Sequence, residues 1–163
     1  MKTASSTTSV TGSTEPAYRA LIRTIGLLKR VMEPYFAQHH ITSSQWAVLG
    51  ILSCGHNGHE GGLRLTDLSD RLLVRPPSVT GVVDRLQRMG LVRREISQDD
   101  HRAKMVVLTD DGHRIVQRVR EGHAQRVQGV LGALKEEEQQ ELRRLLMQLG
   151  DHLEELAEAE SKS

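Results

Sequence analysis

Apolar residues recur at helical spacing over two long stretches of this chain, one toward each end. The first stretch predicts a helix over residues 15–39, in which Thr14 or Glu15 caps the start and Pro16 suits the first turn. We expect Pro34 to kink this helix or to break it near its end. The apolar stripe of this helix consists of Leu21, Ile25, Leu28, Met32 and Tyr35.

The second stretch predicts two further helices, one beginning at 109–111 and one covering residues 135–159. The core side of the first is marked by Ile115, Val119, Val127, Val130 and Leu134. The stripe of the second consists of Leu142, Leu145, Leu146, Leu149, Leu153 and Leu156. Because so short a chain offers the terminal stripes no obvious partner, we expect them to form a dimer interface.

Shorter elements are expected between these ends. Thr42 and Gln45 fit a capping box that opens a largely apolar helix, and four glycines within residues 54–62 predict a loop. The elements expected next are an edge strand over 63–65, a helix capped by Thr66 and running to about Leu73, a helix from Pro76 to a cap at Gly90, and strands over 92–96 and 104–108.

Two short helices followed by two strands and a loop, over residues 65–109, form the pattern of a winged helix-turn-helix. On a helical projection of residues 76–89, one side must face the core and the other is free to enter a DNA groove. The core side consists of Val79, Val82, Val83 and Leu86. The free side and its flanks consist of Pro77, Ser78, Thr80, Gly81, Asp84, Arg85 and Arg88.

Each of these features also has a purely structural interpretation. Ser78 and Thr80 would then only cap the helix, Asp84 and Arg88 would form a surface ion pair, and the loop 97–103 would be a solvated turn. The charge pattern favours DNA binding, because residues 64–104 hold nine Arg or Lys and six Asp or Glu, whereas residues 135–160 hold three and nine. Only the basic middle of the chain is suited to approach a polyanion.

The middle of the chain resembles the MarR family of bacterial and archaeal transcriptional regulators. The resemblance covers about residues 16–157 and is strongest from Leu65 to Gly112. The matching residues are 68–69, 77–80, 83–86, 90–92, 100–104, 107–109 and Gly112. The chain departs from the family pattern in the two prolines after Arg75, in the long Gly- and His-rich loop 54–62, and in Lys135 at a helix start.

This resemblance implies a mainly α-helical fold with a small β-wing. It places one domain at 15–159 between tails at 1–14 and 160–163. Within this domain, the winged helix-turn-helix lobe covers 42–109, and the dimerisation helices cover 15–40 and 110–159. The homodimer is expected to bind a pseudo-palindromic double-stranded DNA, with Arg102 of the wing in a minor groove and Asp100 either bracing the wing or contacting nearby backbone. The expected DNA-binding residues are Arg75, Pro77, Ser78, Thr80, Arg85, Arg88, Asp100, Arg102 and Lys104.

The resemblance also implies a repressor that a small ligand, often an anionic phenolic compound, releases from DNA. A pocket of this kind would be lined by Tyr35, Phe36, His39, Trp46 and Leu49, which are equally suited to be ordinary core. Two other sensing mechanisms are open. Cys54 would respond to oxidants, although we expect a buried and inert thiol. Zinc would bind Cys54, His56 and His59 with His39 or His40, although that spacing matches no tight site.

Other functional classes fit the sequence less well. A winged-helix module that binds only protein predicts a depleted basic surface, and the arginines of residues 64–104 argue against it. The chain has no Gly-rich phosphate loop, metal-protease helix or nucleophile elbow, so we expect neither an enzyme nor a cofactor or metal site. With a single cysteine, no membrane-spanning apolar run and no signal core, we expect a cytoplasmic protein.

Overall fold

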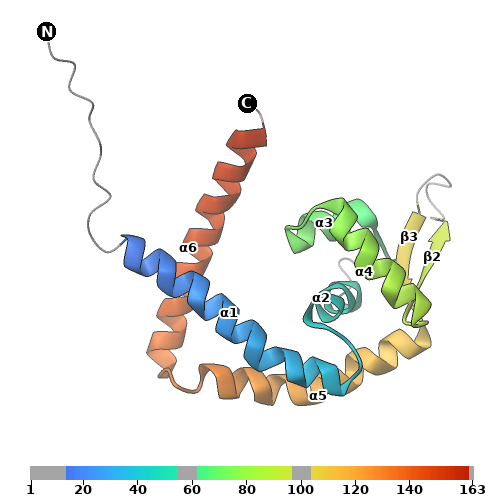
Figure 1. Ribbon diagram of the computed structural model, residues 1–163, viewed down its shortest axis with the longest axis horizontal. Coiled ribbons are helices and arrows are strands. Elements are labelled where there is room, and N and C mark those ends of the chain that lie inside the picture. Colours follow the sequence, from blue (N-terminus) through green and yellow to red (C-terminus); the bar gives the residue numbers. More distant parts are fainter. Residues whose placement is uncertain (1–13, 55–61, 97–103, 162–163) are drawn as a thin grey trace, which may run out of the picture. The chain divides into compact units, whose positions relative to one another are not determined.

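The computed structural model describes residues 14–54, 62–96 and 104–161 (Figure 1). Most of the described chain is helical, and a three-stranded antiparallel sheet accompanies the helices, as predicted. The chain divides into two compact units, one ending at Glu121 and one beginning at Gly122. The elements are α1 Thr14–Gln38, α2 Ser43–Ser53, β1 Leu63–Arg64, α3 Leu65–Leu72, α4 Pro76–Arg88, β2 Val92–Ile96, β3 Lys104–Leu108, α5 Asp110–Leu131 and α6 Glu136–Ser161.

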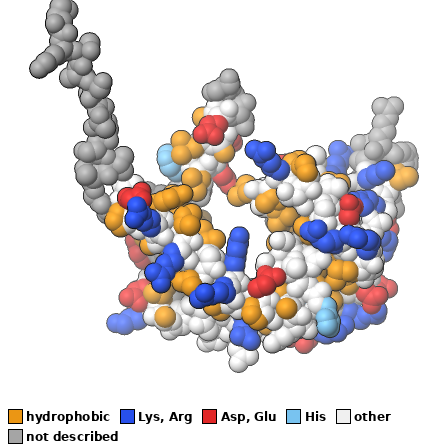
Figure 2. Space-filling view, viewed as in Figure 1, with side chains coloured by type: hydrophobic (Ala, Val, Ile, Leu, Met, Phe, Trp, Pro, Cys, Tyr) orange, Lys and Arg blue, Asp and Glu red, His pale blue; other side chains and the backbone are white. Residues whose placement is uncertain are grey.

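Helix α1 continues through Pro34 to Gln38, so the predicted break at this proline is wrong, whereas a kink there stays a prediction. The turn that follows Pro34 is held because Tyr35 and Phe36 are buried, and because the amide of Ile41 bonds back to the carbonyl of Phe36. The preceding turns are different, since most of their apolar side chains other than the buried Met32 remain exposed (orange in Figure 2). Exposed apolar residues of α1 are Tyr18, Ile22, Ile25, Leu27, Leu28 and Val31.

The predicted capping box at the start of α2 is confirmed. The amide of Gln45 donates to the Thr42 hydroxyl at 3.2 Å, and the amide of Thr42 donates to Gln45 Oε1 at 2.8 Å. These bonds satisfy backbone donors that the first turn of a helix leaves free. Helix α2 is central as predicted, because Val48 and Leu49 are fully buried.

Helix α3 starts one residue before the predicted cap Thr66, so that cap is wrong. Arg64 precedes the helix, and its backbone amide donates to Oδ2 of Asp67 at 3.2 Å. The carboxylate at the third helical position therefore satisfies the backbone amide of the N-cap residue. The helix ends at Leu72, and Leu73 follows in the left-handed region with φ of 52°.

The end of helix α4 is confirmed at Gly90, which has φ of +73°. The amide of Gly90 bonds to the carbonyl of Gln87, and the amide of Leu91 bonds to the carbonyl of Leu86. This pair of bonds is a Schellman motif, which satisfies the last carbonyls of a helix and needs a residue that tolerates positive φ. The burial of both Leu86 and Leu91 completes the motif and turns the chain into β2.

Both predicted wing strands have the expected bounds, and the edge strand before α3 is also confirmed. The sheet order is β1-β3-β2, with all pairs antiparallel. The register sets Val92 opposite Leu108 and Ile96 opposite Lys104. Central strand β3 buries Val106, whereas the ends of β2 and β3 farthest from the core are exposed and lead into residues 97–103, outside the described residues.

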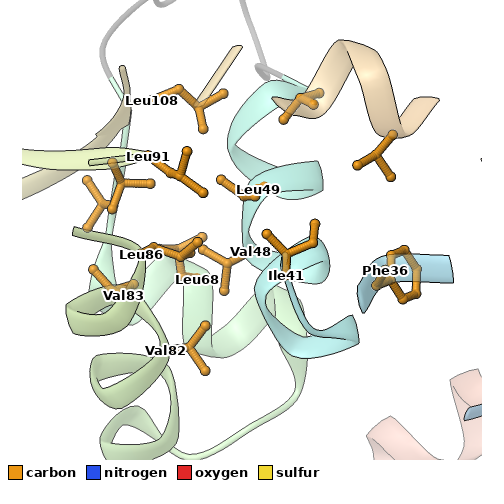
Figure 3. Packing of buried hydrophobic residues seen from close by; sticks show 14 of the residues in the cluster. Phe36, Ile41, Val48, Leu49, Leu68, Val82, Val83, Leu86, Leu91 and Leu108 are labelled. Carbon is orange, nitrogen blue, oxygen red and sulfur yellow. The ribbon is translucent and has the colours of Figure 1, made fainter. Parts of the chain in front are cut away.

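The hydrophobic core of the first unit joins α4 to its neighbours (Figure 3). The predicted core side of α4 is confirmed, because all four of its residues are buried. Leu68 from α3, Val48 and Leu49 from α2 and Leu108 from β3 surround them. This packing fixes α4 on a scaffold of helices and sheet, so its opposite side is presented in one orientation.

Thr109 joins the start of α5 to the turn after α4. Its hydroxyl donates to the carbonyl of Gly90 at 2.6 Å and accepts the amide of Gly112 at 3.1 Å. The amide of Thr109 also bonds to the carbonyl of Leu91. The predicted start of α5 at residues 109–111 is therefore confirmed, with the threonine as the capping side chain.

The second unit contains the rest of α5 and the whole of α6. Val127 and Val130 are 36% and 37% exposed, so their predicted place on the core side is wrong; along this helix the core ends at Val119. At the start of α6, the backbone amide of Lys135 donates to Oε2 of Glu138 at 2.7 Å, which supplies the cap that a Lys side chain does not. The exposed apolar residues of α6 are Leu145, Leu146, Met147, Leu149, Leu153 and Leu156.

Candidate nucleic-acid interface

Helix α4 presents a polar and basic side away from the core. Ser78, Arg85 and Arg88 are exposed, and Thr80 is partly exposed. Lys and Arg side chains (blue in Figure 2) stand out over the lobe that contains α3, α4 and the strands. The predicted DNA-binding residues of this helix therefore share an accessible face, as a groove-binding helix requires.

The first turn of α4 has few free backbone donors. Pro76 and Pro77 occupy the first two helical positions and lack an N–H, and the amide of Ser78 bonds to the carbonyl of Arg75 at 3.0 Å. A helix N-terminus usually attracts phosphate through such amides. Here the side chains must supply most of that attraction. Arg75 is suited to this role, because it is exposed at the N-cap position and its side chain makes no capping bond.

The hydroxyl of Thr80 is engaged within the helix. It donates to the carbonyl of Pro76 at 3.0 Å, a carbonyl four residues earlier in the same helix. Its oxygen still has accepting capacity. Thr80 is therefore suited to accept a hydrogen bond from a base amino group rather than to donate one to a phosphate.

Asp84 makes a different ion pair from the one considered in the sequence analysis. Its carboxylate lies 2.6 Å from a guanidinium nitrogen of Arg94 on β2. Arg88 instead contacts the backbone carbonyl of Asp84, at 3.4 Å from its Nε. No spacing along the chain predicts this pair, because the two residues lie ten positions apart on different elements. Only the turn at Gly90 brings them together.

The wing contributes described residues only at its base. Lys104 is exposed at the start of β3, opposite Ile96, which is also exposed. The predicted wing residues Asp100 and Arg102 lie outside the described residues. On β2, Arg93 pairs with Glu95 at 2.5 Å, so this arginine is balanced by a carboxylate on its own strand.

The residues of the predicted ligand pocket form an aromatic cluster between α1 and α2. The rings of Phe36 and Trp46 stack at 6.0 Å between centroids, and Tyr35 meets Phe36 edge-on at 5.6 Å and His39 at 5.2 Å. Tyr35, Phe36 and Leu49 are buried, whereas His39 and Trp46 are partly exposed. The structure thus joins Tyr35, Phe36, His39 and Trp46 by ring contacts, and Leu49 belongs to the hydrophobic core that Phe36 also enters.

An open hollow lies at the other end of α2. It is lined by Ser53, His113, Val116, Gln117, Arg120 and Glu121. A guanidinium nitrogen of Arg120 on α5 donates to the Ser53 hydroxyl at 2.8 Å and lies 3.6 Å from Sγ of Cys54. This contact ties the end of α2 to α5.

Cys54 is exposed, so the prediction of a buried thiol is wrong. The cysteine follows the last residue of α2, where the helix leaves the core. Of the other residues considered for zinc, His56 and His59 lie outside the described residues. Among residues 14–54, 62–96 and 104–161, no three His, Cys, Asp or Glu side chains form a group able to hold a metal ion.

The arrangement of α3, α4 and the β2–β3 hairpin defines a winged helix-turn-helix protein. The family model of the MarR family matches residues 41–104. The chain is 31% identical over 119 residues to YkoM, an uncharacterized HTH-type transcriptional regulator of Bacillus subtilis, an alignment that covers 73% of this chain and 74% of YkoM. This chain belongs to the MarR family and is a transcriptional regulator.

Two further similarities bear on its activity. The chain is 27% identical over 113 residues to the homoprotocatechuate degradative operon repressor of Escherichia coli, covering 69% of this chain and 73% of that repressor. The structure matches that of MepR from S. aureus in complex with DNA, with a TM-score of 0.73, 26% identity, and coverage of 83% of this chain and 97% of MepR. No described helix has the length and apolar content needed to cross a membrane.

Proposed function

We propose that this regulator is a homodimeric repressor that binds a pseudo-palindromic operator and is released by a small anionic phenolic ligand. The observation that carries the proposal is the basic outer side of α4, held on a rigid core and followed by a wing. The known relatives support the DNA-binding part, because MepR was solved in complex with DNA.

The exposed apolar residues of α1 and α6 support the dimer. Each of these helices presents several large apolar side chains that the described chain leaves exposed, and contiguous apolar surface of this kind marks an interaction site. A second copy of the chain is the simplest partner, because a two-fold interface places two DNA-binding lobes on one palindromic site.

Helix α4 is proposed to read the major groove through Ser78, Thr80, Arg85 and Arg88, with Pro77 in apolar contact near the helix start. Arg75 is proposed to bind phosphate, since the two prolines remove backbone donors from the first turn. From the wing, Lys104 is proposed to bind phosphate and Arg102 to enter the minor groove, with Asp100 bracing it.

A similarity to a repressor of homoprotocatechuate degradation supports both repression and a phenolic effector. The aromatic cluster of α1 and α2 is the proposed pocket. His39 would bind the acidic group of the ligand, and the partly exposed side chains of His39 and Trp46 are proposed to admit it. Ligand binding there would require the stacked pair of Phe36 and Trp46 to separate.

The direct test is selection of a duplex from a randomised pool by the wild-type protein, followed by affinity measurement at several salt concentrations. Arg85→Ala and Arg88→Ala should each weaken binding to the selected duplex by roughly tenfold, through lost base or phosphate contacts. The matched control is Arg19→Ala, which removes an exposed arginine from α1. Equal effects of all three variants, or failure to select any duplex, would contradict the proposal.

The dimer is tested by light scattering on size-exclusion fractions. Leu153→Lys on α6 should produce monomers, because it places a charge in the proposed interface. The control Glu154→Lys introduces the same side chain at the next, exposed position and should leave dimers intact. A wild-type monomer at micromolar concentration would refute the homodimer.

The effector is tested with 3,4-dihydroxyphenylacetate as probe and phenylacetate as the hydroxyl-free control. Trp46 is the only tryptophan, so its fluorescence reports directly on the proposed pocket. We expect the phenolic acid to change this emission and to release the selected duplex. Release without a change in Trp46 emission would place the effector site elsewhere.

A further inference from the structure

Arg94 connects the recognition helix to the wing. From β2 it reaches back to α4, where one guanidinium nitrogen lies 2.6 Å from Oδ1 of Asp84 and the other donates to Oε1 of Gln87. Its side chain is only 25% exposed, which is less than that of either neighbouring charged residue on the strand. The planar guanidinium therefore donates hydrogen bonds to two side chains that lie three positions apart on one helix.

The chemistry of arginine suits this task. A guanidinium presents its donors in a fixed fork, so two simultaneous bonds define a direction as well as a distance. Asp84 and Gln87 share one face of α4, because residues three apart on a helix are neighbours. Rotation of β2 about its own axis would break at least one of the two bonds.

The adjacent arginine of β2 behaves differently. Successive side chains of a strand point to opposite faces, so Arg93 points away from α4 and pairs with Glu95 on its own strand. Of two neighbouring residues with the same charge, only one therefore connects the helix with the wing. This difference provides a matched control.

We propose that Arg94 is a positioning residue, which holds the wing at the angle to α4 that lets both elements engage adjacent grooves at once, without itself contacting DNA. The inference rests on the proposed DNA-binding function of α4 and the wing. The charge of Arg94 is already neutralised by Asp84, so this arginine attracts a phosphate only weakly. Simultaneous engagement of two linked elements fails when their geometry is lost.

A substitution of Asp84 distinguishes a positioning role of Arg94 from direct contact of Arg94 with DNA. Its carboxylate lies on the recognition helix and on electrostatic grounds alone should repel DNA. If Arg94 bound phosphate, Asp84→Ala would strengthen DNA binding, because it would remove a negative charge and free the arginine. If Arg94 positions the wing, the same substitution weakens binding to the specific duplex.

The test measures the affinity of Arg94→Ala, Asp84→Ala and the double variant for the duplex selected by the wild-type protein and for a scrambled duplex. We expect each single variant to bind the selected duplex roughly tenfold more weakly, comparable to one mismatched base pair, and the double variant to be no weaker than Arg94→Ala. Binding to the scrambled duplex and the slope of log K against log salt should stay at the wild-type values.

Direct contact predicts another set of results. Loss of one phosphate contact lowers the salt slope by about 0.9 and weakens specific and scrambled duplexes alike. That result for Arg94→Ala, or tighter binding by Asp84→Ala, would overturn the inference. Arg94→Lys keeps the charge but not the fork, so it should resemble Arg94→Ala; wild-type affinity in this variant would also overturn it.

Two controls complete the design. Arg93→Ala removes the same charge from the same strand and should leave discrimination between the two duplexes unchanged. Thermal melting should show that all variants remain folded, because exposed and half-exposed ion pairs contribute little to stability. If the wild-type protein selects no duplex, the proposed function fails together with this inference, whereas a selected duplex with an unaffected Arg94→Ala variant refutes only the inference.

Discussion

The hydroxyl of Tyr35 on α1 donates a hydrogen bond to the backbone carbonyl of Val119 on α5. The two residues lie 84 positions apart and are both buried. This bond therefore joins the last turn of the first helix to the helix that follows the wing. Since Val119 belongs to the same core as α4, the bond connects the first helix to the DNA-binding lobe.

Tyr35→Phe tests the contribution of this bond. Phenylalanine keeps the ring but leaves the buried carbonyl without the hydroxyl, so we expect the free energy of unfolding to fall by about 1 kcal/mol. Urea denaturation measures the change. Tyr18→Phe is the control, because Tyr18 is exposed on the same helix and should give no change. Equal stability of both variants would show that the bond is not stabilising.

Gly112→Ala should be strongly destabilising. A Cβ at this position would lie 2.1 Å from the backbone carbonyl oxygen of Leu91, which is held in place by its bond to Thr109. We expect a loss of roughly 2 kcal/mol or more, because the start of α5 must move away from the turn after α4. Differential scanning calorimetry would report a lower melting temperature.

Gly129→Ala serves as the opposite case on the same helix. A Cβ there meets nothing within 4 Å, so the helix propensity of alanine decides the outcome. We expect a gain of up to about 1 kcal/mol. A comparable loss in both glycine variants would mean that close approach at Gly112 is not the cause.

Thr42→Ala should remove the capping box of α2. The hydroxyl accepts the amide of Gln45, and its loss is expected to cost about 1 kcal/mol of stability. Ser44→Ala, in the exposed second position of the same turn, should be close to neutral. Urea denaturation measures both variants, and equal stability of the two would show that the Thr42 cap does not stabilise the protein.

Leu73 stores backbone strain in the turn between α3 and α4. It has φ of 52°, a region that favours glycine, and its side chain is 78% exposed. Leu73→Gly relieves this strain but increases the conformational entropy of the unfolded chain, which opposes folding. We expect a net stabilisation of about 0.5 kcal/mol. Val74→Gly, at a position without positive φ, should destabilise it. A thermal melt that ranks the two variants in the reverse order would exclude strain at Leu73.

Most of the fold was predictable from local signals. The capping box at Thr42, the turn at Gly90 and the strands on both sides of residues 97–103 are each encoded by residues close together in sequence. The projection of α4 onto two sides was also predictable, because the helical period alone separates Val79 from Arg85 and Arg88. These local rules led directly to the winged helix-turn-helix.

The errors arose where a local rule competed with packing or with another side chain. Pro34 removes one backbone hydrogen bond of the helix, but the burial of Tyr35 and Phe36 stabilises a further helical turn. Thr66 is a good capping residue, but the helix begins one residue earlier, with Arg64 at the N-cap and its amide bonded to the carboxylate of Asp67. Cys54 follows an apolar helix, but the helix end carries it out of the core.

By itself, the sequence determined which elements form, which side of α4 carries the basic residues, and that the protein resembles a MarR regulator, because each depends on spacing within one element or one motif. Tertiary structure alone decided which arginine pairs with Asp84. Asp84 was free to pair with its helix neighbour Arg88, yet its carboxylate lies beside Arg94. The reason is physical: the Gly90 turn folds β2 back onto α4, and no periodicity along the chain encodes the distance between side chains on two different elements.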